Sequence, residues 1–264
     1  MLNGHLTAAG HSSPASADPR LWLSYPPLEA GQTLLLCLPH AGGGAAAFSP
    51  WIPLAPPTLR ICPVQLPGRE KRVREQPVDD LSVLVLTLGP ILKQHLDKPF
   101  AIFGHSMGAL IGFELSRELR RSYGLLPSRL FVSAARAPQL PRRDPLISAS
   151  SDQELLNELS GLGGMASEVL RHKELLGLSL PTIRADLHLC ESYVYRPEQA
   201  LECPISAFGG LGDEGVTRDG LLAWEEQTSS AFKGRFYPGD HFYIRSNLHH
   251  VLAAIDTDLS TSTR

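Results

Sequence analysis

The five residues Gly104-His105-Ser106-Met107-Gly108 have the spacing G-x-S-x-G. They follow a short apolar run at residues 99–103 and precede a run with apolar residues at helical spacing. This order of strand, tight corner and helix holds a serine as an exposed nucleophile, and the flanking glycines avoid collisions with the adjoining strand and helix. In the alternative interpretation, Ser106 only caps the helix. The context favours a nucleophile.

A glycine-rich turn at residues 40–45 follows another apolar run. Glycines let the backbone fold back and direct its N–H groups into a site. In a serine hydrolase, such a loop supplies one oxyanion donor and the residue after the nucleophile supplies the other. We therefore expect an oxyanion hole formed by the backbone N–H groups of Ala41 and Met107. A loop without chemical role is the alternative. A phosphate cradle is disfavoured, because this turn has no G-x-x-x-x-G-K-[ST] and no G-x-G-x-x-G.

A serine hydroxyl needs a base to remove its proton, and the base needs an orienting carboxylate. For a serine on such a corner, the acid and then the histidine follow along the chain. Among ten histidines, His241 fits best, because it comes directly after a predicted strand and turn. The others lie near the N-terminus, in the glycine-rich turn, beside the serine or in helical patterns. The carboxylates that fit are Asp213, Glu214 and Asp240.

Short apolar runs with turn residues at their ends predict the strands that carry these loops. The runs lie at residues 34–39, 59–64, 99–103, 130–134, 205–209 and 234–238. Helical patterns lie between several of them, and in the one at residues 81–96 Pro90 predicts a kink or break. Strands that alternate with helices predict an α/β fold with a mostly parallel central sheet flanked by helices. Loops at the carboxyl edge of such a sheet are where sites gather.

The alternation stops at residues 138–197, where helical patterns occur without a convincing strand. A helical insertion placed after the nucleophile predicts a lid over the site, and the alternative is that these helices pack on the sheet. The predicted organisation has a disordered leader, a core in two pieces, the lid between them and a disordered tail. The leader comprises residues 1–20, and the tail comprises residues 257–264. The core comprises residues 21–137 and 198–256, and the lid comprises residues 138–197.

Composition excludes several functional classes. The 264 residues carry a formal net charge of −3 and no long basic run, so we expect neither nucleic-acid nor membrane binding. The one basic cluster, residues 69–74, includes Glu70 and is predicted to be a solvated loop. Four scattered cysteines without C-x-x-C indicate reduced thiols in a cytoplasmic protein. No apolar run approaches 18 residues, and the first twenty residues lack the hydrophobic centre of a signal peptide.

Over about residues 20–255, the chain closely resembles the type II (editing) thioesterases of polyketide and nonribosomal peptide biosynthesis. The matching runs are LPHAGG at 38–43, QLPGRE at 65–70, GHSMG at 104–108, LPTIRAD at 180–186 and GDHF at 239–242. The resemblance implies an α/β-hydrolase fold with a helical lid insertion. It also selects Asp213 as the acid, which gives the triad Ser106, Asp213 and His241. One departure is visible: members often carry an extra Asp and Arg before the acid, where this chain has Leu211-Gly212.

The resemblance further implies a thioesterase that hydrolyses acyl or aminoacyl groups from the phosphopantetheine arm of carrier proteins. Such enzymes clear misloaded or stalled units from the synthases of antibiotic biosynthesis. The substrate brings the phosphopantetheine, so neither cofactor nor metal is expected. The expected partners are acyl or peptidyl carrier protein domains, met transiently by a monomer. Carrier proteins are usually acidic, so Arg142, Arg143 or the basic cluster at residues 69–74 are candidate contacts, unless they are simply solvated.

Three alternatives remain open at this point. The first is a serine esterase or lipase that acts on free esters with the same triad. The second is a catalytically inactive hydrolase fold that serves as a binding module, although a module has no need of all three triad residues. The third is an acyltransferase or offloading enzyme, which is disfavoured because no carrier domain is fused to the chain.

Overall fold

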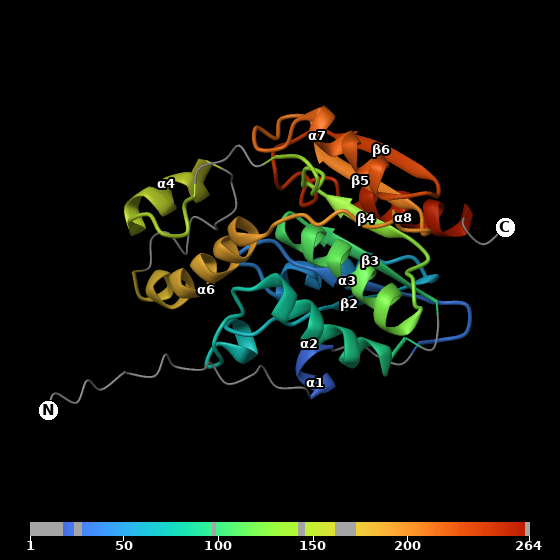
Figure 1. Cartoon of the computed structure of the whole chain (residues 1–264), viewed down its shortest axis with the longest axis horizontal. Coiled ribbons are helices and arrows are strands. Elements are labelled where there is room, and N and C mark those ends of the chain that lie inside the picture. Colours follow the sequence, from blue (N-terminus) through green and yellow to red (C-terminus); the bar gives the residue numbers. More distant parts are fainter. Residues whose placement is uncertain (1–17, 24–27, 97–98, 142–145, 162–172, 262–264) are drawn as a thin grey trace, which may run out of the picture.

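The computed structural model describes residues 18–23, 28–96, 99–141, 146–161 and 173–261, excluding the side chains of residues 159–161 and 173–176. A six-stranded sheet of order β2-β1-β3-β4-β5-β6 forms its centre, and each neighbouring pair is parallel (Figure 1). The strands are β1 (Thr33–Leu38), β2 (Leu59–Pro63), β3 (Phe100–His105), β4 (Leu130–Ser133), β5 (Ile205–Gly210) and β6 (Phe232–Tyr237). The predicted α/β fold with a mostly parallel sheet is confirmed.

Helices cover both faces of this sheet, as the continuous apolar strands require. In β1, Leu34 and Leu36 point into one core and Leu35 and Cys37 into the other. The first core is closed by α2 (Leu81–Lys93) and α3 (Met107–Tyr123), and the second by η1 (Ala45–Leu54) and α8 (Leu248–Thr261). The carboxyl ends of the strands are thereby left to the loops that carry the candidate site.

Two helices fill much of the interval between β4 and β5. They are α4 (Asp152–Gly161) and α6 (Lys173–Ser192), which lie together on one side of the molecule in Figure 1. They fall within the predicted insertion at residues 138–197. The remaining short elements are α1 (Pro19–Trp22), η2 (Glu70–Arg72), α7 (Arg218–Leu222) and η3 (Ala223–Gln227).

The chain ends differ from the prediction. Residues 257–264 were expected to form a disordered tail, but α8 continues to Thr261. The cause lies in Asp258, whose fully buried carboxylate binds Arg235 and Lys233 of β6 at 2.6–2.8 Å. Most of the predicted leader lies outside the described residues, and α1 already begins at Pro19. The predicted break at Pro90 is also absent, because α2 runs through it to Lys93.

The basic cluster at residues 69–74, predicted to be a solvated loop, is exposed at Lys71 and Arg74 but not at its other two arginines. Arg69 and Arg72 are only 6% and 2% exposed. The Arg72 guanidinium lies 4.2 Å from the centre of the Trp22 ring and pairs with Glu75 at 2.6 Å. These partners offset the free-energy cost of burying the Arg72 charge. The pattern of charges along the sequence does not reveal such partners. No helix in the described ranges is long and apolar enough to cross a membrane.

Candidate active site

Ser106 sits at a sharp corner between β3 and α3. Its backbone has φ 55° and ψ −117°, a conformation that costs an L-residue about 1–3 kcal/mol and must be held by its surroundings. The Ser106 N–H donates to the carbonyl of Ser133 at the end of β4, at 2.7 Å. The residue is partly exposed although its neighbours in β3 and α3 are buried. The corner therefore presents the hydroxyl outside the sheet, as the sequence predicts.

The two flanking glycines are required by close packing of backbone on backbone. A Cβ on Gly104 would lie 2.0 Å from the Gly108 carbonyl oxygen. A Cβ on Gly108 would lie 2.1 Å from the Leu38 carbonyl oxygen at the end of β1. Neither neighbour is a side chain that can rotate away, so any larger residue forces the backbone to move. The physical reason given for the G-x-S-x-G spacing is thus present in the structure.

The predicted base and acid meet directly. His241 Nδ1 and Asp213 Oδ2 are 2.8 Å apart, and the Asp213 side chain is fully buried. The other oxygen, Oδ1, accepts from the N–H groups of Gly215 and Val216 at 2.9 and 3.2 Å. With Nδ1 donating to the carboxylate, the neutral imidazole carries its lone pair on Nε2. This is the tautomer that a general base acting through Nε2 needs.

The rival carboxylates have other surroundings. Asp240 accepts from the N–H of Phe242 at 2.7 Å and so stabilises its own turn. Glu214 is exposed to solvent. Of the three carboxylates that the sequence left open, Asp213 is the one that contacts His241.

The loops that carry the acid and the base are tied to each other. The Gly212 N–H donates to the Gly239 carbonyl at 2.8 Å, and these glycines lie one residue before Asp213 and two residues before His241. A Cβ on Gly212 would approach that oxygen to 3.3 Å, which is tight. Leu211, the other residue at which the chain departs from the resembling family, is 66% exposed. The departure therefore leaves the bond between Asp213 and His241 intact.

Three histidines gather at the corner. The ring of His105 lies 5.4 Å from that of His241 and 6.0 Å from that of His40, and the Phe242 ring packs against all three. Burial, with Arg245 and His241 nearby, lowers the pKa of His40 to about 4. Burial, followed by the charges of His241 and His40, holds the pKa of His105 well below its usual range. Both rings are therefore neutral near pH 7, and His241 alone carries the carboxylate contact.

The glycine-rich turn folds as the sequence predicts. Gly42 has φ 74°, and the Gly43 N–H donates to the His40 carbonyl at 2.9 Å. A Cβ on Gly43 would lie 2.8 Å from the His40 ring. Within the described part of the chain, no hydrogen bond to protein uses the N–H groups of Ala41 and Met107. These are the two donors expected to form the oxyanion hole.

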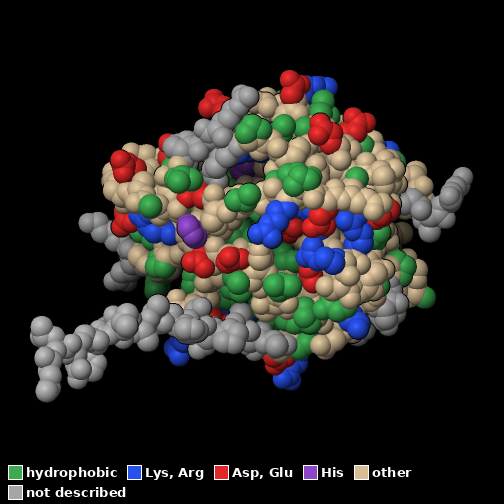
Figure 2. Space-filling model, viewed as in Figure 1, with side chains coloured by type: hydrophobic (Ala, Val, Ile, Leu, Met, Phe, Trp, Pro, Cys, Tyr) green, Lys and Arg blue, Asp and Glu red, His purple; other side chains and the backbone are tan. Residues whose placement is uncertain are grey.

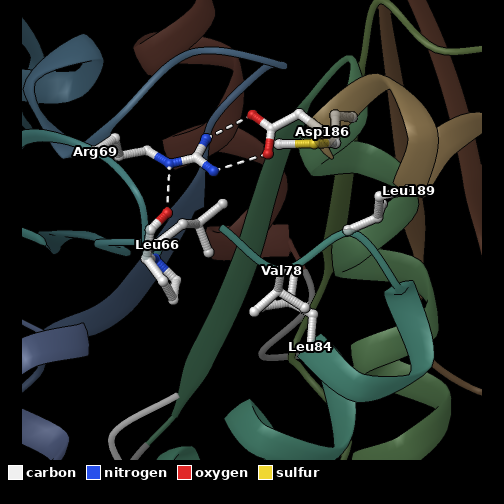
Figure 3. A pocket seen from close by; sticks show the side chains of 8 residues that line it. Leu66, Arg69, Val78, Leu84, Asp186 and Leu189 are labelled. Carbon is white, nitrogen blue, oxygen red and sulfur yellow. Dashed lines mark hydrogen bonds and ion pairs between the residues drawn. The ribbon is translucent and has the colours of Figure 1, made fainter. Parts of the chain in front are cut away.

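A buried ion pair joins this turn to α6, and sequence reasoning assigned it no role. Arg69 contacts both oxygens of Asp186, Nη1 to Oδ2 at 2.6 Å and Nη2 to Oδ1 at 2.7 Å (Figure 3). The two residues are 117 positions apart. Both lie inside runs that mark the resemblance, 65–70 and 180–186, and that co-occurrence was the available signal. Nothing in either run alone indicates that they pair.

A narrow crevice lies beside the corner, lined by apolar side chains and by the Arg69–Asp186 pair. Met107 lines it together with Leu66, Val78, Leu84 and Leu189, and Figure 3 shows the last four facing the crevice below the Arg69–Asp186 pair. Such a lining suits an acyl chain. The crevice in this structure is too small to hold even a water molecule. The side chains that line it must therefore rearrange before an acyl chain can enter.

Comparisons with known proteins identify the family. The model of the thioesterase domain family matches residues 33–259. The gramicidin S biosynthesis protein GrsT of Aneurinibacillus migulanus is 41% identical over 84% of this chain and 87% of its own. Thioesterase PikA5 of Streptomyces venezuelae is 34% identical over 93% of this chain and 88% of its own. The structure of the type II thioesterase BorB, from the borrelidin biosynthetic cluster, has a TM-score of 0.83 and 37% identity, over 95% of this chain and 100% of BorB.

Proposed function

Because the chain belongs to the thioesterase family, we propose that Ser106, His241 and Asp213 are the catalytic triad by which it hydrolyses acyl thioesters. The chain is a type II thioesterase of the kind that edits polyketide and nonribosomal peptide synthesis. The observation that carries the assignment of residues is the 2.8 Å bond between Asp213 and His241 beside the strained corner of Ser106.

The proposed reaction has two halves. His241 Nε2 takes the proton of the Ser106 hydroxyl as Oγ attacks the thioester carbonyl, and Asp213 stabilises the imidazolium through Nδ1. The C–S bond then breaks, the thiol leaves with the proton from His241, and an acyl-serine remains. His241 then takes a proton from a water molecule as the water oxygen attacks this ester. The bond between the acyl carbon and Oγ breaks, His241 returns the proton to Oγ, and the carboxylic acid is released.

The developing oxyanion needs donors in place before the reaction. We assign this role to the backbone N–H groups of Ala41 and Met107. The assignment is supported by the finding that, among the described residues, neither N–H donates to a protein acceptor. Donors of this kind typically contribute a factor of about 10²–10³ to the turnover rate. The reaction needs only side chains, backbone and water, because the phosphopantetheine arrives with the substrate.

The proposed substrates are acyl or aminoacyl groups on carrier protein domains. GrsT is a gramicidin S biosynthesis protein, and YbtT is a type II thioesterase from a yersiniabactin NRPS/PKS pathway with a TM-score of 0.81. By analogy, we expect this chain to bind its carrier protein transiently and to remove acyl units that block the synthase. None of the four cysteines forms a disulfide bond in the described part of the chain, which supports our expectation of a reducing, cytoplasmic setting.

Covalent labelling tests the assignment of the nucleophile. A fluorophosphonate should modify Ser106 and no other serine, and mass spectrometry of the digested protein locates the adduct. Ser106→Ala should lose about 10⁴-fold or more of kcat on an acyl-pantetheine thioester while keeping its thermal unfolding temperature. If Ser106→Ala keeps more than a few per cent of wild-type kcat, the nucleophile is another residue.

A further inference from the structure

Helix α6 does more than cover the crevice, because one of its faces holds two loops of the site. Thr182, Ile183 and Asp186 lie on that face, since residues three and four apart in a helix are neighbours. All three are buried, at 5%, 4% and 1% exposure. The Thr182 hydroxyl donates to the Gly68 carbonyl at 2.6 Å. Ile183 packs so closely on Gly42 that a Cβ there would lie 2.7 Å from its Cγ1.

Asp186 binds the oxyanion loop, residues 40–45, through the backbone. Its Oδ2 accepts from the Gly42 N–H at 2.7 Å and from Arg69 Nη1 at 2.6 Å. Gly42 directly follows Ala41, the proposed donor. The carboxylate therefore fixes the peptide next to the one whose N–H is proposed to stabilise the oxyanion.

Arg69 binds the same loop one residue further on. Its Nη1 donates to the Gly43 carbonyl at 2.9 Å, and its Nε donates to the Pro67 carbonyl at 3.1 Å. The guanidinium thus links the oxyanion loop, the loop at residues 65–69 and α6. An N–H and a carbonyl of successive glycines are held by one buried ion pair, and a loop of three consecutive glycines has little stiffness of its own.

We propose that Asp186 and Arg69 are positioning residues for the hydrolysis, because together they hold the Ala41 N–H where the tetrahedral oxyanion forms. This inference rests on the proposed function, and in particular on Ala41 as an oxyanion donor. The pair touches neither Ser106 nor His241 and acts only through the loop. The geometry of the oxyanion hole consequently depends on the contact between α6 and the oxyanion loop. When α6 moves away from this loop, the Ala41 N–H is no longer held in place.

The test compares reaction with binding. Asp186→Asn keeps the shape and one acceptor for Gly42 but removes the charge that pairs with Arg69, and Asp186→Ala removes both. For each variant, kcat and KM are measured on an acyl-pantetheine thioester. The inhibition constant of an alkyl boronic acid, which forms a tetrahedral adduct on the serine, is measured alongside. Labelling to completion with a fluorophosphonate counts the competent sites, so that kcat refers to folded enzyme only.

A positioning role predicts a split between these quantities. For Asp186→Ala, kcat should fall by about 10–100-fold, and the boronate inhibition constant should rise by a similar factor. KM should change by less than about threefold. Because the two residues act as a unit, Asp186→Ala with Arg69→Ala should lose scarcely more kcat than either change alone. Arg69→Lys, which keeps the charge but not the paired contacts, should fall between wild type and Arg69→Ala.

A second ion pair of α6 supplies the matched control. Arg184 Nη2 contacts Asp152 Oδ1 of α4 at 2.5 Å, and Asp152 is 65% exposed. Asp152→Asn should leave kcat, KM and boronate binding within about twofold of wild type. An equal loss of kcat in Asp152→Asn would overturn the proposal, since it would attribute the effect to α6 packing in general.

The remaining outcomes are equally decisive. Unchanged kcat per labelled site and unchanged boronate binding in Asp186→Asn and Arg69→Lys would overturn the positioning role, even if thermal stability fell. Since both variants are close in shape to the native side chains, they give the answer if Asp186→Ala does not fold. Failure of the proposed function looks different: wild-type Ser106 would then resist labelling, or Ser106→Ala would stay active.

Discussion

Asp213 and Glu214 are adjacent acidic residues with opposite surroundings. The Asp213 side chain is fully buried and accepts three hydrogen bonds, from His241, Gly215 and Val216. Glu214 faces solvent. An orienting carboxylate must hold one imidazole tautomer, and that requires fixed donors on both of its oxygens. At the scale of single residues, the acid is identified by what surrounds it and not by its type.

Replacing Asp213 by Asn tests this identification. The amide oxygen still accepts from Gly215 and Val216, but its NH₂ favours the imidazole tautomer with the proton on Nε2. We expect kcat on an acyl-pantetheine thioester to fall by about 10³–10⁴-fold with little change in KM or unfolding temperature. Glu214→Gln is the matched control and should stay within about twofold of wild type. Equal losses in the two variants would contradict the assignment.

The sequence predicted individual site residues where a local pattern carried them. Ser106 follows from its glycines, and His241 follows from its position after a strand and a turn. Asp213 needed the family resemblance to separate it from Glu214. Arg69 and Asp186 gave no local signal, because a buried ion pair across 117 positions depends on tertiary packing. Arg69 was even predicted to be solvated, since its charge was counted without its partner.

At the scale of elements, the β3–α3 corner is tightly constrained by backbone packed on backbone. Gly108→Ala should destabilise the protein by at least about 2 kcal/mol, since its Cβ would lie 2.1 Å from a backbone oxygen of β1. Urea unfolding followed by circular dichroism measures this. Gly177→Ala in α6 is the control: no atom lies within 4 Å of its Cβ, and alanine should add about 0.5–1 kcal/mol. A Gly108→Ala protein as stable as wild type would contradict the packing described.

Elements were easier to predict than their ends. All six strands were found because each overlaps a short, largely apolar run that ends in turn residues. Burial on both faces leaves β1 and β3 few polar residues, whereas the edge strand β6 is only half-buried and carries Lys233 and Arg235. The end of α8 was missed, because residues 257–261 are mostly polar and their helix depends on contacts with β6. Proline was also misleading in α2, where packing of the apolar face outweighs the missing hydrogen bond at Pro90.

At the scale of the whole molecule, Asp258 fastens α8 to the edge of the sheet. Burial raises its pKa, but hydrogen bonds from Arg235, Lys233 and Ser206 outweigh this and lower the pKa to about 2. The unfolded carboxyl titrates near 3.9, so the native state binds its proton later as the pH falls. The stability that this group contributes is complete above about pH 5 and is lost as the pH falls from about 4 to 2.

Asp258→Asn tests this attachment. At pH 7 the substitution should lower the free energy of unfolding by about 2 kcal/mol, the size implied by the depressed pKa. Below about pH 4 the difference between the variant and wild type should shrink. Urea unfolding between pH 3 and 7 measures both quantities. A difference that stays constant over this range would mean that the carboxylate does not contribute through its charge.

The surface charges bear on where the proposed carrier protein would dock. Figure 2 shows basic and acidic side chains interspersed over the face with α2 and α3. A groove of about 480 Å³ lies there, and two of its arginines pair with glutamates, Arg117 with Glu114 at 2.8 Å and Arg121 with Glu118. Of the basic residues in the cluster at 69–74, only Lys71 and Arg74 are exposed. Arg142 and Arg143, the other predicted contacts, lie outside the described residues.

The measurement that tests the central claim most directly compares one acyl group on three carriers. Initial rates of hydrolysis are measured for a propionyl group on an acyl carrier protein, on pantetheine and on p-nitrophenol, with wild type and Ser106→Ala. We predict the highest kcat/KM on the carrier protein and loss of all three activities in Ser106→Ala. A preference for the p-nitrophenyl ester, with the carrier-bound group left intact, would contradict it and identify an esterase.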